Sequence, residues 1–174
     1  MARYLDNFIK ALIKNDQKNS YVLFYSSLRR NLKSEILKLK SDRVDIIQFR
    51  FPPTFLDLIW NKLHILPIES LIGDVDVFIT SDWTEPPVKK AKKATILYDL
   101  IVFKYPEETH GKTEFNPFKF IISPNIVASQ KRKLKWVKKE ADMILCISKS
   151  TAEDAAQILN INRKKLFVIY PGIN

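Results

Sequence analysis

The chain has 174 residues, 46% of them hydrophobic, and a formal net charge of +10 at pH 7. This length fits one ordinary domain with a hydrophobic core and excludes a disordered tail. No apolar run reaches the length of a membrane span, and the amino terminus lacks the charged-then-apolar layout of a secretory signal. We therefore expect a cytoplasmic protein, with peripheral attachment at the inner face of the membrane as an option.

In the first part of the chain, apolar residues over 3–14 recur at the spacing of a helix with one broad buried face. Residues 21–25 and 44–51 are rich in apolar and aromatic residues and predict strands. A weaker helical pattern lies between them, over 28–39. Residues 56–66 predict a further helix that stops near the proline that follows it.

Four more short β-rich runs predict strands at 75–80, 94–98, 143–147 and 165–170. The Ser-x-x-Glu pattern that starts at Ser150 predicts a capping box at the start of the helix between the last two strands. Six strands that alternate with helices predict an α/β fold. We expect a doubly wound, mostly parallel, Rossmann-like sheet with helices on both faces.

A long helix is predicted over 124–142, with one apolar arc and one basic arc. The apolar arc consists of Val127, Leu134, Val137 and Ala141. The basic arc consists of Lys131, Arg132, Lys135, Lys138 and Lys139. Such a surface beside Trp136 suits anionic lipid headgroups, and a solvated face without a partner is the alternative.

The positive charge has several explanations: nucleic acid, an anionic membrane surface, phosphorylated ligands, or a merely solvated lysine-rich surface. No helix-turn-helix, zinc-finger or RNP-type signature supports nucleic acid. The single cysteine, Cys146, fits a buried small hydrophobic position. With His64 and His110 as the only histidines, no spacing suggests a metal or redox site, and no cofactor is expected.

Ligands of open α/β sheets bind beyond the carboxyl ends of the strands. Asp82 and Trp83 follow the strand predicted at 75–80, and Tyr98 and Asp99 end or follow the one at 94–98, so these residues are the first candidates for a site. Ser148, which follows the strand at 143–147, is a weaker candidate. As alternatives, the two aspartates cap turns or helices, and Trp83 fills a gap in the core. Residues 108–117 have the composition of a mobile loop, either a lid or an ordinary surface loop.

Four segments, in this order, resemble the amino-terminal domain of family 4 glycosyltransferases, retaining enzymes of the GT-B fold with two Rossmann-like domains. The segments are Arg3-Tyr4-Leu5 with its helix; Ser81-Asp82-Trp83-Thr84-Glu85-Pro86-Pro87; Tyr98-Asp99-Leu100 with Tyr105-Pro106-Glu107; and the run from Ala141 to Ser150 with Tyr170-Pro171-Gly172. The resemblance spans nearly the whole chain. It implies transfer of a mannosyl- or glucosyl-like hexose from a nucleotide sugar to a carbohydrate or lipid-linked acceptor.

In that family the amino-terminal domain mainly holds the acceptor, and the carboxy-terminal domain makes most contacts with the nucleotide sugar. The resemblance therefore implies one acceptor-side domain over residues 1–174, with the donor-binding domain on a missing segment or a separate chain, and little or no transferase activity for this chain alone. Arg3 and Tyr4 would lie near the cleft. Asp82, Trp83 and Ser148 would line the acceptor side, and Tyr98 and Asp99 would lie near the reacting sugar.

Two departures from the family pattern concern the site. The family usually has His followed by Asp where this chain has Tyr98-Asp99. A tyrosine can donate a hydrogen bond but supplies no cation near neutral pH, so Tyr98 either keeps a positioning role or marks a degenerate site. The chain also has only three glycines and no glycine-rich loop to hold a phosphate.

A third departure concerns the sheet. The family has a first strand before the helix that holds Arg3, and in the doubly wound order this strand lies in the middle of the sheet. We expect its place to be taken by a strand from another chain, by a swapped or repacked sheet, or by residues of a longer native protein. A well-folded monomer in light scattering would count against a supplied or swapped strand.

Two other functions fit the sequence. The chain is either a non-catalytic remnant or assembly partner that supplies half of a cleft, or a basic module that binds a membrane surface. A downstream Rossmann-like domain with paired glutamates would favour the enzyme, and steep salt dependence of binding would favour the basic module.

Overall fold

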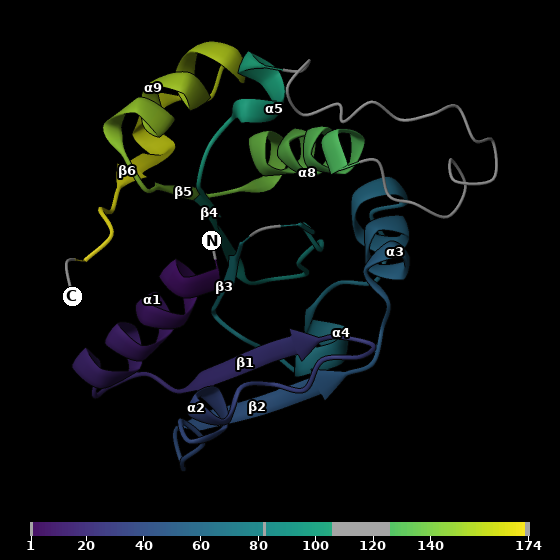
Figure 1. Ribbon diagram of the computed structural model, residues 1–174, viewed down its shortest axis with the longest axis vertical. Helices are drawn as coiled ribbons and strands as arrows, with labels where there is room; N and C mark the ends of the chain where they lie inside the picture. The colour runs from purple at the N-terminus through teal and green to yellow at the C-terminus, as the bar shows by residue number, and fades with distance from the viewer. Residues whose placement is uncertain (1, 82, 106–125, 173–174) are drawn as a thin grey trace. The chain divides into compact units, whose positions relative to one another are not determined.

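The computed structural model describes residues 2–81, 83–105 and 126–172, which form an α/β protein with parallel strands flanked by helices (Figure 1). This confirms the predicted α/β class and the parallel direction of the strands. The chain divides into two compact units, Met1–Phe55 and Leu56–Asn174, and each is described by itself. None of the described helices is both long and apolar enough to cross a bilayer.

The first unit contains two parallel strands and three helical segments. Its elements are α1 (Ala2–Asn15), β1 (Tyr21–Ser26), α2 (Ser34–Leu37), β2 (Val44–Phe49) and α3 (Pro53–Leu56), the last of which runs into the second unit. Strands β1 and β2 pair in parallel from Tyr21 opposite Val44 to Ser26 opposite Phe49. The helix predicted over 28–39 is wrong in extent. The Ser27 hydroxyl accepts a hydrogen bond from the Arg30 backbone N–H at 3.0 Å, and this local turn competes with a helix there.

The second unit is built on a four-stranded parallel sheet in the order β3-β4-β5-β6. Its strands are β3 (Val77–Thr80), β4 (Lys92–Leu97), β5 (Met143–Cys146) and β6 (Leu166–Val168). Its helices are η1 (Asp57–Lys62), α4 (Glu69–Ile72), α5 (Ile101–Lys104), α8 (Ile126–Glu140), α9 (Lys149–Ile158) and the short η2 (Arg163–Lys165). The strands predicted from β-rich runs all form, because those runs place apolar side chains on both faces of a sheet.

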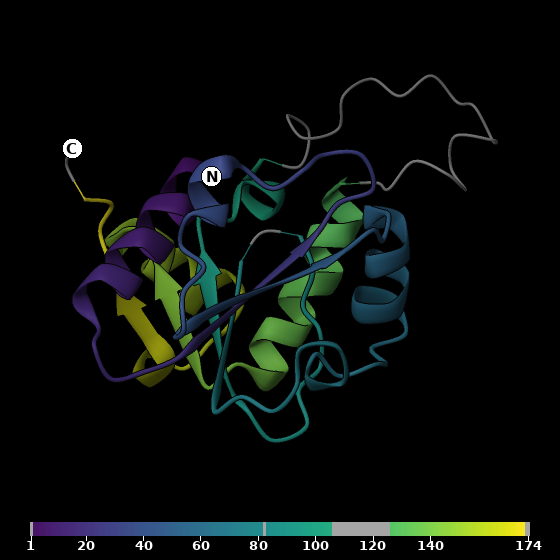
Figure 2. The same cartoon turned by 90° about the horizontal axis from the view of Figure 1, so that it is seen from below.

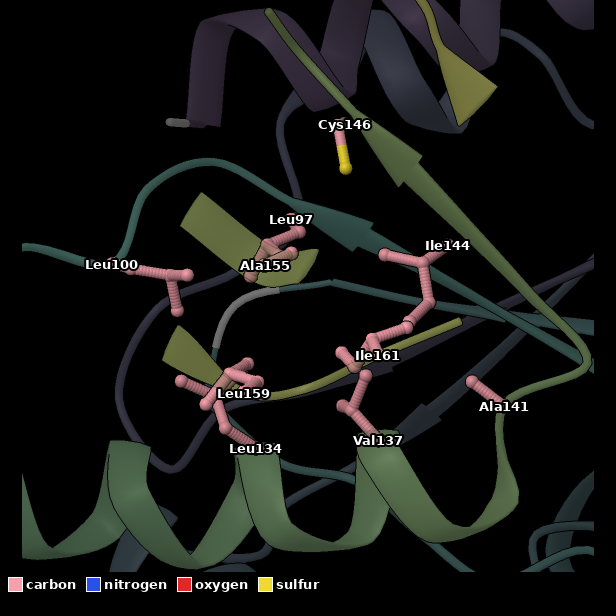
Figure 3. Close-up of a cluster of buried hydrophobic side chains, with 10 residues drawn as sticks. All are labelled: Leu97, Leu100, Leu134, Val137, Ala141, Ile144, Cys146, Ala155, Leu159 and Ile161. Atoms are coloured by element: carbon pink, nitrogen blue, oxygen red, sulfur yellow. The ribbon is translucent and has the colours of Figure 1, made fainter. Parts of the chain in front are cut away.

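One hydrophobic core joins α8 and α9 to one face of this sheet. Figure 3 shows Val137 of α8 pointing toward Ile161, and Leu134 pointing toward Leu159. Ile144 and Cys146 of β5 are fully buried in the same cluster, which confirms the buried position predicted for Cys146. Burial raises the pKa of its thiol to about 11, because a thiolate is poorly solvated in an apolar core.

The helix predicted over 56–66 ends earlier than expected. The segment Asp57–Lys62 is a π-helix, and the backbone N–H of Leu63 closes its last wide turn on the Leu58 carbonyl at 2.9 Å. His64 and Leu66 then take positive φ angles of 54° and 62°, which an α-helix excludes. The helix is therefore ended by a left-handed turn several residues before Pro67.

The described strands form two sheets instead of one continuous sheet. Strand β1 pairs with β2, and β3 pairs with β4; within the described residues, neither β1 nor β3 has a second hydrogen-bonded neighbour. Removal of the first strand from the order 3-2-1-4-5-6 would also leave two sheets, although of two and three strands, whereas this chain has sheets of two and four strands. The source of a strand that would join the sheets stays a prediction.

Candidate functional site

The candidate residues of the second unit lie along one edge of its sheet. Because β3, β4 and β5 are parallel neighbours, their carboxyl ends lie at the same edge, and Trp83, Tyr98, Asp99 and Ser148 follow these ends. We refer to these four residues as the carboxyl edge. Asp82, predicted to belong with them, lies outside the described residues.

Ser148 and Tyr98 are joined by one threonine of α9. The Ser148 hydroxyl caps α9 by accepting a hydrogen bond from the Thr151 backbone N–H at 3.0 Å. The Thr151 hydroxyl donates to the Tyr98 carbonyl at 2.9 Å. The cap of α9 is therefore Ser148, two residues before the predicted Ser150, because Ser148 still has the extended backbone from which a capping side chain reaches the first turn.

Tyr98 and Asp99 differ in how much they present to solvent. Tyr98 is only 9% exposed, so its ring lies within the protein at the end of β4. Asp99 is half-buried, and its Oδ1 accepts a hydrogen bond from the Ile101 backbone N–H at 3.2 Å. One of the two carboxylate oxygens of Asp99 therefore stabilises the turn, as the alternative interpretation predicted.

The Trp83 side chain is exposed to solvent, and its backbone is fixed by a hydrogen bond. The side chain is 47% exposed, which argues against its filling a gap in the core. The Asn61 side chain donates to the Trp83 carbonyl at 2.8 Å and accepts from the Glu85 backbone N–H at 3.0 Å. The segment that carries Trp83 is therefore fixed by a buried amide.

Beneath this segment lies a buried ionic network on the sheet. The Glu85 carboxylate is fully buried and accepts hydrogen bonds from the hydroxyls of Thr80 and Thr95 at 2.8 and 2.9 Å. Lys93 of β4, also fully buried, places its Nζ 3.3 Å from Glu85 and 3.1 Å from Glu140. A buried charge needs such partners, and here one ammonium lies between two carboxylates.

Glu140, at the end of α8, extends the network to His64. His64 Nε2 lies 2.8 Å from the Glu140 carboxylate, and Nδ1 lies 2.8 Å from the Trp60 carbonyl. Both neighbours only accept hydrogen bonds, so both bonds form only when the two ring nitrogens each carry a proton. The ring also stacks on Trp136, with centroids 3.6 Å apart.

A second buried carboxylate, Asp57, anchors η1 to α8. It accepts hydrogen bonds from Ser129 and Asn61, and its Oδ2 lies 2.7 Å from the Arg132 guanidinium. Burial alone would raise the pKa of Asp57, but these hydrogen bonds and the charge of Arg132 outweigh it and lower the pKa. Burial alone would also raise the pKa of Glu140. The hydrogen bonds from His64 and Lys93 outweigh it, and the pKa of Glu140 is lowered.

We expect the protein to lose stability in acid through these carboxylates. A carboxyl whose pKa is lower in the folded state contributes stability above its unfolded pKa of about 4, and this contribution disappears as the pH falls through the folded pKa. Urea unfolding measured from pH 7 to pH 3 should therefore show stability decreasing below about pH 4. Asp57→Asn should be less stable at pH 7 and show a smaller decrease in acid. A stability that is the same at pH 3 and pH 7 would contradict this assignment.

Arg3 and Tyr4 belong to the first unit, in the first turns of α1. The Tyr4 ring stacks on Phe8, one turn later in the helix, with centroids 6.2 Å apart. Burial raises the pKa of the Tyr4 phenol. That Arg3 and Tyr4 belong to the same site as the carboxyl edge stays a prediction.

Several residues that hold the carboxyl edge in place escaped the sequence analysis. Asn61, Lys93 and Glu140 carry no motif, and Glu85 was noted only as part of the resemblance. Lys93 gave no signal of its own, because it ends a lysine-rich run just before the strand predicted at 94–98. Within the described ranges, no three His, Cys, Asp or Glu side chains converge where a metal ion could bind.

No model of a known protein family, no curated protein and no solved structure matches the sequence or its fold.

Proposed function

We propose that this chain is the acceptor-side half of a retaining glycosyltransferase of the GT-B type, which transfers a mannosyl- or glucosyl-like hexose from a nucleotide sugar in its two-domain form. The observation that carries the proposal is the carboxyl edge. Trp83, Tyr98, Asp99 and Ser148, which are distant in sequence, follow three adjacent parallel strands. This is where open α/β sheets bind ligands.

Trp83 is the residue best suited to contact a sugar. Its exposed indole offers an apolar face for stacking against the C–H face of a pyranose ring, and its backbone is fixed by Asn61. A fixed backbone reduces the entropy lost on binding. The Ile101 N–H bonds only to Oδ1 of Asp99. The other carboxylate oxygen, Oδ2, can accept a hydrogen bond from a sugar hydroxyl.

The proposal predicts that a hexoside shifts the indole N–H signal of Trp83. The test is a titration of the ¹⁵N-labelled chain with methyl α-mannopyranoside and methyl α-glucopyranoside, followed by two-dimensional NMR. A lone acceptor-side half should bind weakly, with a Kd of about 1 mM or higher. The Trp83 signal is identified by its loss in Trp83→Phe.

The other two tryptophans are controls in the same spectrum. The indole N–H of Trp60 donates to the Leu66 carbonyl and that of Trp136 to the Asn61 carbonyl, so neither group is available to a ligand. A shift of the Trp83 signal alone supports the proposal. No shift with either sugar, or equal shifts of all three signals, would remove its support.

A further inference from the structure

We propose that the exposed lysines of α8, together with the apolar turn after η1, dock on an anionic lipid bilayer. The surface consists of Lys131, Lys135, Lys138 and Lys139 of α8 with Leu63 and Ile65, and we call it the α8 basic surface. This proposal does not rest on the proposed function, since none of these residues belongs to the carboxyl edge.

The lysines form one charged face of α8. Successive residues of a helix are 100° apart, so these four positions fall within an arc of about 100°. All four are exposed, while Leu134 and Val137, which lie outside this arc, are buried. The predicted apolar arc is confirmed, and so are the four lysines of the basic arc; Arg132, predicted with them, is instead half-buried and pairs with the buried Asp57. The only acidic residue of α8, Glu140, is paired with Lys93 and His64, so it does not neutralise the face.

Contacts within the second unit join this charged face to the apolar turn. Lys135 Nζ and Lys139 Nζ lie 5.9 and 5.0 Å from the centre of the Trp136 ring. The same ring stacks on His64, which lies between Leu63 and Ile65 in the chain. Figure 2 shows α8, in green, beside the blue segment that includes η1, as Figure 1 does from another side.

The apolar part of the surface is exposed to solvent. Leu63 is 56% exposed and Ile65 is 53% exposed. The turn that presents them contains His64 and Leu66 with positive φ, a conformation that is sterically unfavourable for residues with a side chain. Solvation of the lysines alone does not explain why two aliphatic side chains are exposed beside them.

The combination of charge and exposed aliphatic groups favours a bilayer over nucleic acid as the partner. Lysines attract the anionic headgroups, and aliphatic side chains beside them enter the boundary between headgroups and acyl chains. Nucleic acid would use the lysines, but it offers little to leucine and isoleucine. The net charge of +10 draws the whole chain toward such a surface.

The test is sedimentation of the full chain with phosphatidylcholine vesicles, with and without phosphatidylglycerol. We expect binding only to the anionic vesicles. The triple variant Lys135→Gln, Lys138→Gln, Lys139→Gln should bind them roughly 100-fold more weakly, since each basic side chain near an anionic leaflet changes affinity about five-fold. Leu63→Ser with Ile65→Ser should also weaken binding, with little effect on thermal unfolding because both sites are exposed.

The matched control is Lys89→Gln, Lys90→Gln, Lys164→Gln, which removes the same charge from exposed sites of the second unit outside α8. It should bind the anionic vesicles within a few-fold of the parent chain. An equal loss in the two triple variants would overturn the proposal, because net charge alone would then explain binding. So would no binding to anionic vesicles, no effect of the Leu63 and Ile65 changes, or tighter binding to a single-stranded oligonucleotide.

Discussion

Lys93→Met is expected to lower the free energy of unfolding by roughly 3–5 kcal/mol, because it leaves a buried carboxylate without its cation. Lys93 and Glu85 are both fully buried, with Lys93 Nζ 3.3 Å from Glu85 Oε1. Methionine keeps most of the length and apolar character of the lysine stem, so the loss reports the charge more than the packing. Urea unfolding followed by circular dichroism measures the change.

The neighbouring lysine is the control for this prediction. Lys92 is 76% exposed and lies 3.5 Å from Asp142, so Lys92→Met should change the stability by no more than about 0.5 kcal/mol. The double variant Lys93→Met with Glu85→Gln should be more stable than Lys93→Met alone, since the uncompensated charge is removed with its partner. Equal effects of Lys92→Met and Lys93→Met would show that the network contributes little.

Trp60→Ala is expected to cost about 3–5 kcal/mol, as large-to-small changes of buried aromatic residues do. Trp60 is 1% exposed, and its indole N–H donates to the Leu66 carbonyl at 3.0 Å. The change therefore opens a cavity behind η1 and removes a donor from the left-handed turn that follows. Trp60→Phe should cost less, because it keeps most of the ring.

Trp83→Ala is the matched comparison, with the same chemical change at an exposed position. Its cost should be within about 0.5–1 kcal/mol, because the bond from Asn61 goes to the backbone carbonyl, which alanine retains. Similar losses in the two variants would mean that the Trp83 side chain packs into the protein. That result would also weaken its proposed contact with a sugar.

The buried network is connected to the carboxyl edge through the side chain of Asn61. Asn61 bonds to the backbone of both Trp83 and Glu85, and Glu85 bonds to Lys93, Thr80 and Thr95. The segment after β3 is therefore held by polar groups that are themselves buried. Buried networks of this kind fix a backbone more strictly than exposed ones, because an unmade bond costs the full desolvation of its groups.

The sequence alone determined the features that depend on local pattern. Short β-rich runs predicted the strands, and the 3.6-residue spacing of Val127, Leu134, Val137 and Ala141 predicted which side of α8 is buried. The positions of Trp83, Tyr98, Asp99 and Ser148 at one edge followed from the parallel direction of the strands. These inferences succeeded because helix and strand periodicity express which side of each element meets the core.

Only the tertiary structure decided which polar residues are buried and how the helix before Pro67 ends. Lys93 is buried because Glu140, 47 residues away, and Glu85 pair with it. Asp57 is buried because Ser129, 72 residues away, and Arg132 bond to it. A charge enters a protein interior only where partners compensate for its lost hydration, and no local pattern shows which distant residues will supply them.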